Sequence, residues 1–197
     1  MRTLWRALAA LRFLVKVIAG GLPALVLSLV IGFVAYDVLY FQPQKPKIDQ
    51  MIAAATEEER NPPEAVVRLV RADSHQRVAS AAHWALVRDP ADPPNSKRPM
   101  STLVWHTRLV LWWACVWLHL SERAQITLII SRSYMGRGIY GFSAASQVLF
   151  NRPLALLSLD EAATLVTIPH CATCFYTKPK DFAERRDYLL SRLQASH

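Results

Sequence analysis

The feature that most constrains this chain is an uninterrupted apolar run near its amino terminus. From Val17 to Tyr36 the sequence contains no charged residue. A helix rises about 1.5 Å per residue, so about 20 such residues span the roughly 30 Å hydrocarbon core of a bilayer. The run therefore predicts one transmembrane helix over residues 17–38.

The charges on either side of the run predict its orientation. The acids begin only after the run, at Asp37, whereas four cations and no acid precede it: Arg2, Arg6, Arg12 and Lys16. Cations favour the cytoplasmic side, so residues 1–16 are predicted to be a cytoplasmic basic segment and the rest of the chain to lie across the membrane. A cleaved signal peptide is the alternative. It fits less well, because the run exceeds the usual apolar region of about 7 to 15 residues and no small-residue cleavage site follows it.

Composition indicates a folded body with a mild positive charge. The 197 residues are 52% hydrophobic and 19% charged, which argues against disorder. Setting the four leading cations aside leaves 19 cations against 15 acids, a net charge of +4. This balance suits an anionic bilayer surface or a pyrophosphate ligand. Since the chain has no basic run and its body is predicted to be exported, a nucleic-acid-binding class is excluded.

Residues 39–60 are predicted to be a spacer and a juxtamembrane helix. The stretch FQPQKPK contains two prolines, and the helix after it ends at Asn61-Pro62-Pro63. Next, PPEAVVRLVRADSHQRVASAAHWALVR predicts one or two helices, and the proline-rich DPADPPNSKRP predicts a loop.

A tryptophan-rich stretch, STLVWHTRLVLWWACVWLHL, begins at Ser101 and holds four of the six tryptophans. His106 and Arg108 interrupt it, and only Leu109 to Leu118 is free of ionisable groups other than a cysteine, which is too short to span a bilayer. Two interpretations remain open: a buried central helix of a globular domain, or a helix on the bilayer surface with its tryptophans at headgroup level.

Two helices are predicted to close the chain. Ser158 with Glu161 and Asp181 with Glu184 each have the spacing of a capping box. In the last helix the side chains expected to face the core are Phe182, Tyr188, Leu189 and Leu193. No useful stretch alternates with period two, so the body is predicted to be all-α.

Three glycines and two tyrosines crowd the stretch SYMGRGIYGF, and an Ala-rich helical run follows it. Glycines this dense mark a turn that needs positive φ or close approach. From Ser121 to Leu193 the sequence resembles the carboxy-terminal half of glycosyltransferase family 51, the peptidoglycan transglycosylase domain of penicillin-binding proteins and of monofunctional membrane-anchored relatives. The positions that match are Arg132, Tyr134, Gly136, Gly138, Tyr140, Gly141, Ala144, Ala145, Phe150, Leu159, Glu161, Ala162, Ala163, Pro169, Arg185 and Arg186.

This resemblance implies an all-α, lysozyme-like transglycosylase domain over residues 61–197. It also implies a single-pass protein of the bacterial inner membrane with its bulk in the periplasm, acting on lipid-linked peptidoglycan precursor beside other cell-wall synthases. A divalent cation such as Mg²⁺ is a possible cofactor by the same resemblance. The substrate-binding residues that we expect are Arg108, Arg132, Tyr134, Gly136 and Gly141. As alternatives, the glycines merely allow a tight connection between helices, and Arg132 is a surface or helix-capping residue.

The part of the family pattern that handles protons is missing. Polymerisation needs a carboxylate that takes a proton from an acceptor hydroxyl. Asp73 falls where the family has its glutamate, but the rest of that motif fails, and Glu122 is the only acid from Pro99 through Ser133. Asp73 is therefore a weak candidate base, and an exposed aspartate flanked by arginines is the alternative. The sequence predicts a transglycosylase-like domain whose chemistry is lost or weakened.

Cys171 and Cys174 are a disulfide candidate. An oxidising compartment favours a small disulfide ring, with free thiols, zinc binding and redox catalysis as the alternatives, and we predict no metal site. Three hypotheses for the whole chain follow: an impaired glycosyltransferase-like protein that binds precursor or glycan, a non-catalytic scaffold for cell-wall synthases, and an active divergent transglycosylase.

Overall fold

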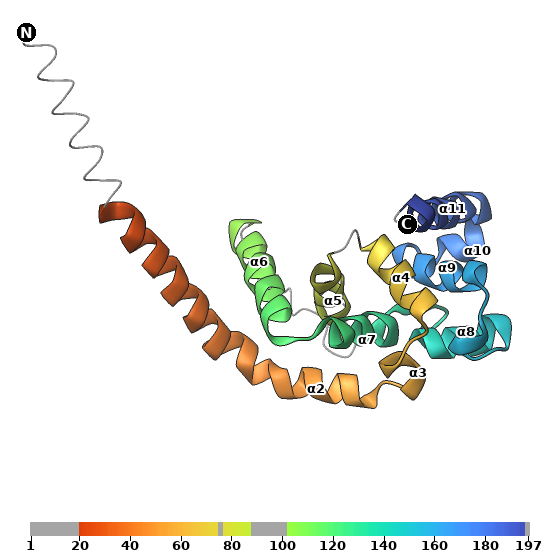
Figure 1. Ribbon diagram of the computed structural model, residues 1–197, viewed down its shortest axis with the longest axis horizontal. Helices are drawn as coiled ribbons and strands as arrows, with labels where there is room; N and C mark the ends of the chain where they lie inside the picture. Colours follow the sequence, from red (N-terminus) through yellow and green to blue (C-terminus); the bar gives the residue numbers. More distant parts are fainter. Residues whose placement is uncertain (1–19, 75–76, 88–101, 196–197) are drawn as a thin grey trace, which may run out of the picture. The chain divides into compact units, whose positions relative to one another are not determined.

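The computed structural model describes residues 20–74, 77–87 and 102–195. The predicted basic segment 1–16, the start of the predicted transmembrane helix and the proline-rich loop lie outside these ranges. The chain divides into two compact units, Met1–Lys45 and Pro46–His197. Helices dominate both, which confirms the predicted helical class (Figure 1).

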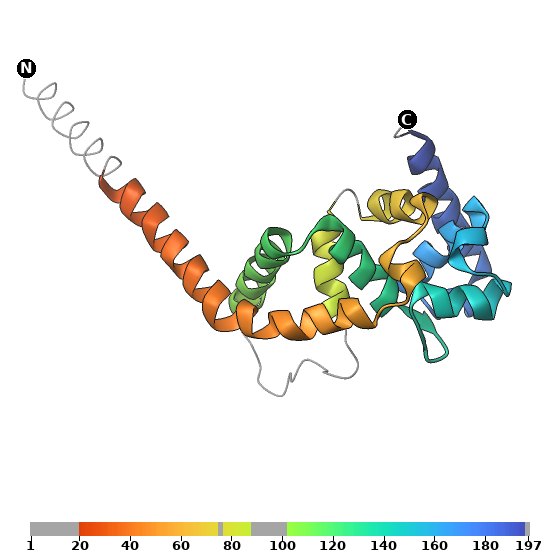
Figure 2. The same cartoon turned by 60° about the horizontal axis from the view of Figure 1, so that its bottom comes forward.

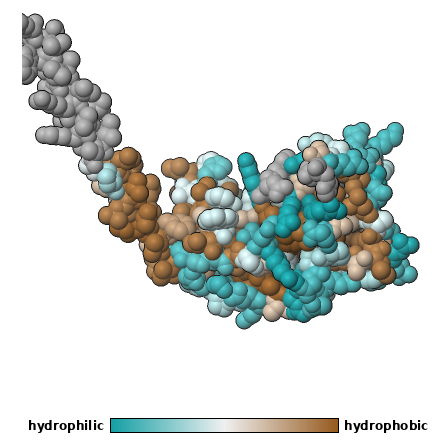
Figure 3. All heavy atoms as spheres, in the orientation of Figure 1, coloured by the Kyte–Doolittle hydropathy of each residue, from teal (hydrophilic) through white to brown (hydrophobic). Residues whose placement is uncertain are grey.

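The amino-terminal helix runs from Gly20 to Ala54, and it is the one described helix that is long and apolar enough to cross a membrane. Its apolar window has a mean hydropathy of 2.2 and is 0% buried. Figure 3 shows much of the part of this helix that follows the grey segment in brown, the colour of hydrophobic residues. Such a helix is what a transmembrane anchor requires, although a signal sequence has the same character.

The expected spacer is itself helical. A π-helical turn, Asp37–Phe41, leads into a 3₁₀ turn, Gln42–Gln44, and then into α2, Lys45–Ala54. Pro43 and Pro46 lie in the first turns of these segments, where a missing backbone N–H is tolerated. The prolines therefore change the type of helix here without ending it.

Helix α3, Glu57–Arg60, ties the juxtamembrane segment to the carboxy-terminal part of the second unit. Thr56 and Glu59 form a capping box at its start. The Glu59 carboxylate also accepts a hydrogen bond from the backbone N–H of Ser143 at 3.2 Å. The neighbouring Glu58 carboxylate accepts one from the N–H of Leu154 at 3.1 Å.

The next four helices differ in how closely they pack against the rest of the second unit. Helix α4, Glu64–Asp73, is amphipathic, and α5, Val78–Val87, packs against α7, Glu122–Arg132. Helix α6, Thr102–His119, contacts α5 but buries only Cys115 and Val116. The prediction of a buried central helix is therefore wrong for α6.

The glycine-rich stretch forms a short hairpin that Figure 2 shows beside α8. Strand β1, Tyr134–Gly136, pairs antiparallel with β2, Ile139–Tyr140, before α8, Phe142–Phe150. The predicted all-α body thus contains a small antiparallel pair, too short to show a period of two in the sequence.

The chain closes with two longer helices and three short turns: a 3₁₀ turn Leu154–Leu156, α9 Leu159–Thr167, a 3₁₀ turn Ile168–His170, α10 Cys174–Thr177 and α11 Pro179–Ala195. The capping box of Ser158 and Glu161 is present at α9. The one expected at Asp181 is wrong, because α11 already begins at Pro179, which is well suited to a first helical position.

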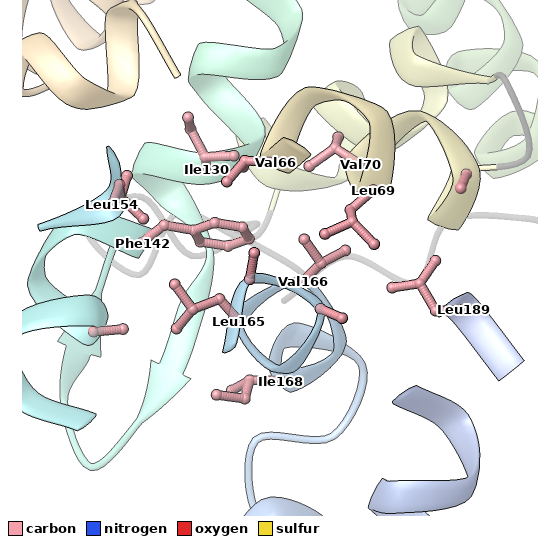
Figure 4. Packing of buried hydrophobic residues seen from close by; sticks show 14 of the residues in the cluster. Val66, Leu69, Val70, Ile130, Phe142, Leu154, Leu165, Val166, Ile168 and Leu189 are labelled. Carbon is pink, nitrogen blue, oxygen red and sulfur yellow. The ribbon is translucent and has the colours of Figure 1, made fainter. Parts of the chain in front are cut away.

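The core of the second unit surrounds α9 (Figure 4). Leu165 and Val166 of α9 lie among apolar side chains of α4, α7, α8 and α11. Of the residues expected to face the core from α11, Phe182, Leu189 and Leu193 are buried, whereas Tyr188 is 59% exposed. This packing holds α4 and the hairpin around a common groove.

Candidate functional site

The second unit contains an open groove of about 990 Å³. It is lined by side chains from the end of α4, from α5 and α7, from the hairpin and from the segment that follows α9. Predicted site residues Asp73, Arg132 and Tyr134 all lie in this lining. A groove of this size is ample for one or two sugar rings with a diphosphate.

The one carboxylate among the groove-lining residues is that of Asp73, at the last position of α4. Its Oδ2 lies 2.6 Å from Nε2 of His170, and its Oδ1 lies 3.8 Å from a guanidinium nitrogen of Arg185. The end of a helix disfavours a negative charge, so these two neighbours stabilise the carboxylate there. His170 comes from the turn after α9, and spacing along the chain gave no sign of this pairing.

Two arginines give the groove its positive charge. Arg132 ends α7, Arg77 precedes α5, and both line the groove. Guanidinium groups bind phosphate oxygens in a bidentate manner, so a groove with two of them suits an anionic ligand. Arg108 is exposed on α6 and is not among the lining residues.

Aromatic rings provide the second part of the lining. The rings of Tyr134 and Tyr140 face each other across the hairpin with centroids 5.1 Å apart, and their side chains remain 44% and 42% exposed. Trp84 of α5 also lines the groove and is 40% exposed. Exposed aromatic faces beside hydroxyl donors are well suited to the apolar faces of sugar rings.

The predicted site glycines are packing residues and do not line the groove. Gly136 and Gly141 have φ of +88° and +84°. A Cβ on Gly136 would lie 3.0 Å from the ring of Tyr176, and one on Gly141 would lie 2.6 Å from Oε1 of Glu59. Both positions require a positive φ and a close approach of neighbouring atoms, which is the alternative role that the sequence left open for these glycines.

Glu59 is an acidic residue that sequence reasoning missed. It is 5% exposed, and its carboxylate accepts hydrogen bonds from the N–H groups of Thr56 and Ser143 at 3.1 and 3.2 Å. The Thr-x-x-Glu spacing at Thr56 is the signal that identifies the capping box. Glu59 is absent from the groove lining, and its bond to Ser143 supports the start of α8.

Cys171 and Cys174 are joined by a disulfide. The two residues inside this ring, Ala172 and Thr173, line the groove. The ring therefore shapes one wall of the groove directly after His170. Cys115, on α6, is a buried free thiol.

His83 is a second unusual group. It belongs to α5, and its ring lies near Trp112 of α6. It is 5% exposed, and neither ring nitrogen has a hydrogen-bond partner within the described residues. Burial, and secondarily the charge of Arg108, lowers its pKa to about 4. The imidazole is therefore neutral at pH 7 and packs as an aromatic ring near Trp84 and Trp112.

The described residues do not fit a protein-bound divalent cation. Nowhere in these ranges do three His, Cys, Asp or Glu side chains converge as metal ligands. Asp73 is the groove's one carboxylate and is already bonded to His170.

Comparison with known proteins finds a match that covers the hairpin and the helices around it. Residues 115–194 match the family model described as transglycosylase. The match begins inside α6, so it includes Arg132, Tyr134 and His170 but excludes Asp73.

Several relatives are far longer than this chain. Penicillin-binding protein 1A of Aquifex aeolicus (strain VF5) is 37% identical over 68 residues, which cover 34% of this chain and 9% of the relative. Penicillin-binding protein 1A of Pseudomonas aeruginosa is 31% identical over 70 residues, which cover 34% and 8%. Penicillin-binding protein 1F of Bacillus subtilis (strain 168) is 31% identical over 75 residues, which cover 37% and 10%. The alignments thus span about a tenth of these curated relatives.

Proposed function

We propose that this chain is a membrane-anchored, periplasm-facing glycosyltransferase-like protein that binds lipid-linked peptidoglycan precursor and polymerises it poorly. The observation that carries the proposal is the composition of the groove. Arg77 and Arg132 suit a diphosphate, and Tyr134 and Tyr140 suit the attached sugars, whereas Asp73 is the one carboxylate among the lining residues. Binding groups are thus retained, whereas the only acid in the lining is the aspartate that stands where the family has its glutamate.

Asp73 itself is a poor replacement for the missing base. Its Oδ2 is bonded to His170, and Arg185 lies near Oδ1. The oxygen that bonds His170 is therefore not free to take a proton from a substrate hydroxyl. Its side chain is also one methylene shorter than the glutamate that it replaces, and a displacement of about 1 Å is enough to slow catalysis greatly.

The exposed face of α6 supports contact with the bilayer. Leu103, Val110 and Trp117 recur every seven residues and are 77%, 60% and 66% exposed. Exposed apolar side chains with tryptophan at a helix surface suit the headgroup boundary, and the chain carries an apolar helix able to anchor it. We therefore place α6 at the lipid surface, where the lipid tail of the precursor would also lie.

The test is binding of labelled lipid-linked disaccharide precursor to the purified full chain in detergent micelles. We expect saturable binding that Arg132→Ala weakens about 10- to 100-fold, because a charge-assisted hydrogen bond contributes about 1.5 to 3 kcal/mol. Arg186→Ala is the matched control, since Arg186 pairs with Asp187 on α11 and does not line the groove. Equal binding by both variants, or no binding by the unmodified chain, would contradict the proposal.

The same experiment tests the scaffold hypothesis. If the unmodified chain binds no precursor but forms a complex with a purified cell-wall synthase, a non-catalytic scaffold replaces our proposal. The specific feature that would then be used is the exposed face of α6, and Trp117→Ser should weaken that complex.

A further inference from the structure

The pairing of Asp73 with His170 joins two groups that the family match does not join. His170 belongs to the matched segment and Asp73 lies before it, 97 residues earlier in the chain. Their side chains are 37% and 23% exposed, and both line the groove. The pair is therefore accessible to a ligand and is not part of the packed core.

The hydrogen bond determines which nitrogen of His170 carries the proton. When Nε2–H donates to the Asp73 carboxylate, the neutral imidazole holds its lone pair on Nδ1. No other described residue hydrogen-bonds this ring. Nδ1 is thus an available proton acceptor, and the adjacent carboxylate stabilises the imidazolium that forms when it accepts a proton.

We propose that His170 is the general base of this groove and that Asp73 is its positioning residue. This inference rests on the proposed function, since it needs a bound sugar diphosphate and an acceptor sugar. In this proposal a histidine, and not the family's glutamate, is the base for the slow polymerisation. The neighbouring cations, Arg185 at Asp73 and Arg77 and Arg132 in the lining, keep the groove positive for the departing group.

The step is a glycosyl transfer between two bound sugars. The acceptor hydroxyl gives its proton to Nδ1 of His170 while its oxygen forms a bond to the anomeric carbon of the donor. The bond from that carbon to the diphosphate oxygen breaks, and the electron pair leaves with the diphosphate. Arg77 and Arg132 stabilise the negative charge on the leaving group, and the imidazolium afterwards returns its proton to water.

The experiment measures long-incubation polymerisation of labelled precursor by the full chain in micelles, together with precursor binding by each variant. We expect His170→Ala to keep binding and to lose polymerisation at least 100-fold, within the range of about 10²- to 10⁴-fold that a general base contributes. Asp73→Asn should lower the rate about 10-fold or more, and the double variant should be no slower than His170→Ala. His119→Gln, a histidine outside the groove lining, is the matched control.

Chemical rescue separates a chemical role from a structural one. Added imidazole should restore a large part of the activity of His170→Ala, and the rescued rate should rise with pH as the free imidazole loses its proton. Rescue must be absent in the control variant and in Arg132→Ala.

Two results would overturn this inference alone: precursor binding without any polymerisation by the unmodified chain, or a His170→Ala variant that polymerises as fast as the unmodified chain. Loss of activity in His170→Ala without rescue, accompanied by loss of binding, would show a structural role and also overturn it. Absence of binding by the unmodified chain would instead contradict the proposed function itself.

Discussion

Replacing Gly141 with alanine should destabilise the second unit by about 2.5 to 6 kcal/mol. Gly141 has φ of +84° and ψ of 150°, a conformation that costs an L-residue about 1 to 3 kcal/mol. The new Cβ would lie 2.6 Å from Oε1 of Glu59 and 3.2 Å from the carbonyl oxygen of Ser131. The carboxylate must then move from the N–H of Ser143, and a hydrogen bond to a charged group contributes about 1.5 to 3 kcal/mol.

Gly138 provides the matched control. It has φ of +78°, but a Cβ there would meet nothing within 4 Å. Gly138→Ala should therefore cost only the backbone strain, about 1 to 2 kcal/mol. Comparing the two variants separates the strain of positive φ, which they share, from the contact with Glu59, which only Gly141→Ala disrupts.

The assay is urea unfolding of the full chain in micelles, followed by tryptophan fluorescence, with unfolding midpoints compared among variants at constant slope. On a Glu59→Ala background, Gly141→Ala should cost less than it does in the unmodified chain, because the clashing carboxylate oxygen is gone. Equal losses for Gly141→Ala and Gly138→Ala in the unmodified background would refute the reasoning. So would a Gly141→Ala variant of full stability that fails only to bind precursor, since that result would place Gly141 in the ligand site.

Three further outcomes follow from the same structure. Replacing Cys171 and Cys174 by serine should cost about 2 kcal/mol by the chain-entropy relation for a short loop, measured by urea unfolding, and mass spectrometry of the unmodified chain should find both sulfurs blocked to thiol reagents. Leu165→Ala, at 0% exposure in the core, should cost about 2 to 5 kcal/mol in the same assay, and a loss below 1 kcal/mol would contradict its central position. Because the folded pKa of His83 is about 4 and its ordinary value is 6.5, the unfolded chain binds the proton more readily, so stability should fall by up to about 3 kcal/mol as the pH drops from 6.5 toward 4. A His83→Phe variant should show a smaller fall in stability between pH 6.5 and pH 4. An identical pH dependence in the two proteins would contradict the assignment of this effect to His83.

Local rules predicted much of the fold because the helices carry their own signals. The capping box at Ser158 fixes the start of α9, and Pro62-Pro63 precede α4 as expected. The same rules failed at Pro43 and Pro46, where proline in a first turn is compatible with helix, and at Asp181, where Pro179 provides an earlier start. The predicted helix boundaries were thus wrong where two local signals competed.

The sequence left two interpretations of the tryptophan-rich helix open for a different reason. Apolar residues surround α6 on all sides, so periodicity could not tell burial in a core from exposure to lipid. Its contacts with α5 decide the matter, and they leave Val110 and Trp117 uncovered. A sequence pattern records which side chains avoid water, but it does not record whether protein or lipid replaces that water.

The site could be predicted only as far as the family pattern reaches. Arg132 and Tyr134 were found by resemblance, and both line the groove. The contacts of Asp73 with His170 and of Glu59 with Ser143 join residues 97 and 84 positions apart, and no local rule addresses such pairs. They form because the core around α9 brings the end of α4 beside the turn that follows α9.

The distribution of these contacts explains how binding and catalysis could separate in this chain. Arg132, Tyr134 and Tyr140, which suit a sugar diphosphate, lie on α7 and the hairpin, within the segment that matches the family, whereas Arg77 lies outside it. Glu58 and Glu59 bond this segment at Leu154 and Ser143. Asp73 lies on α4, also outside the matched segment. A shorter acid at this position leaves room for His170 to bond it. The substitution that weakens the family's base is thus also the one that creates the histidine–carboxylate pair, so restoring glutamate at Asp73 should break the short contact to His170 and lower, not raise, any activity that depends on the imidazole.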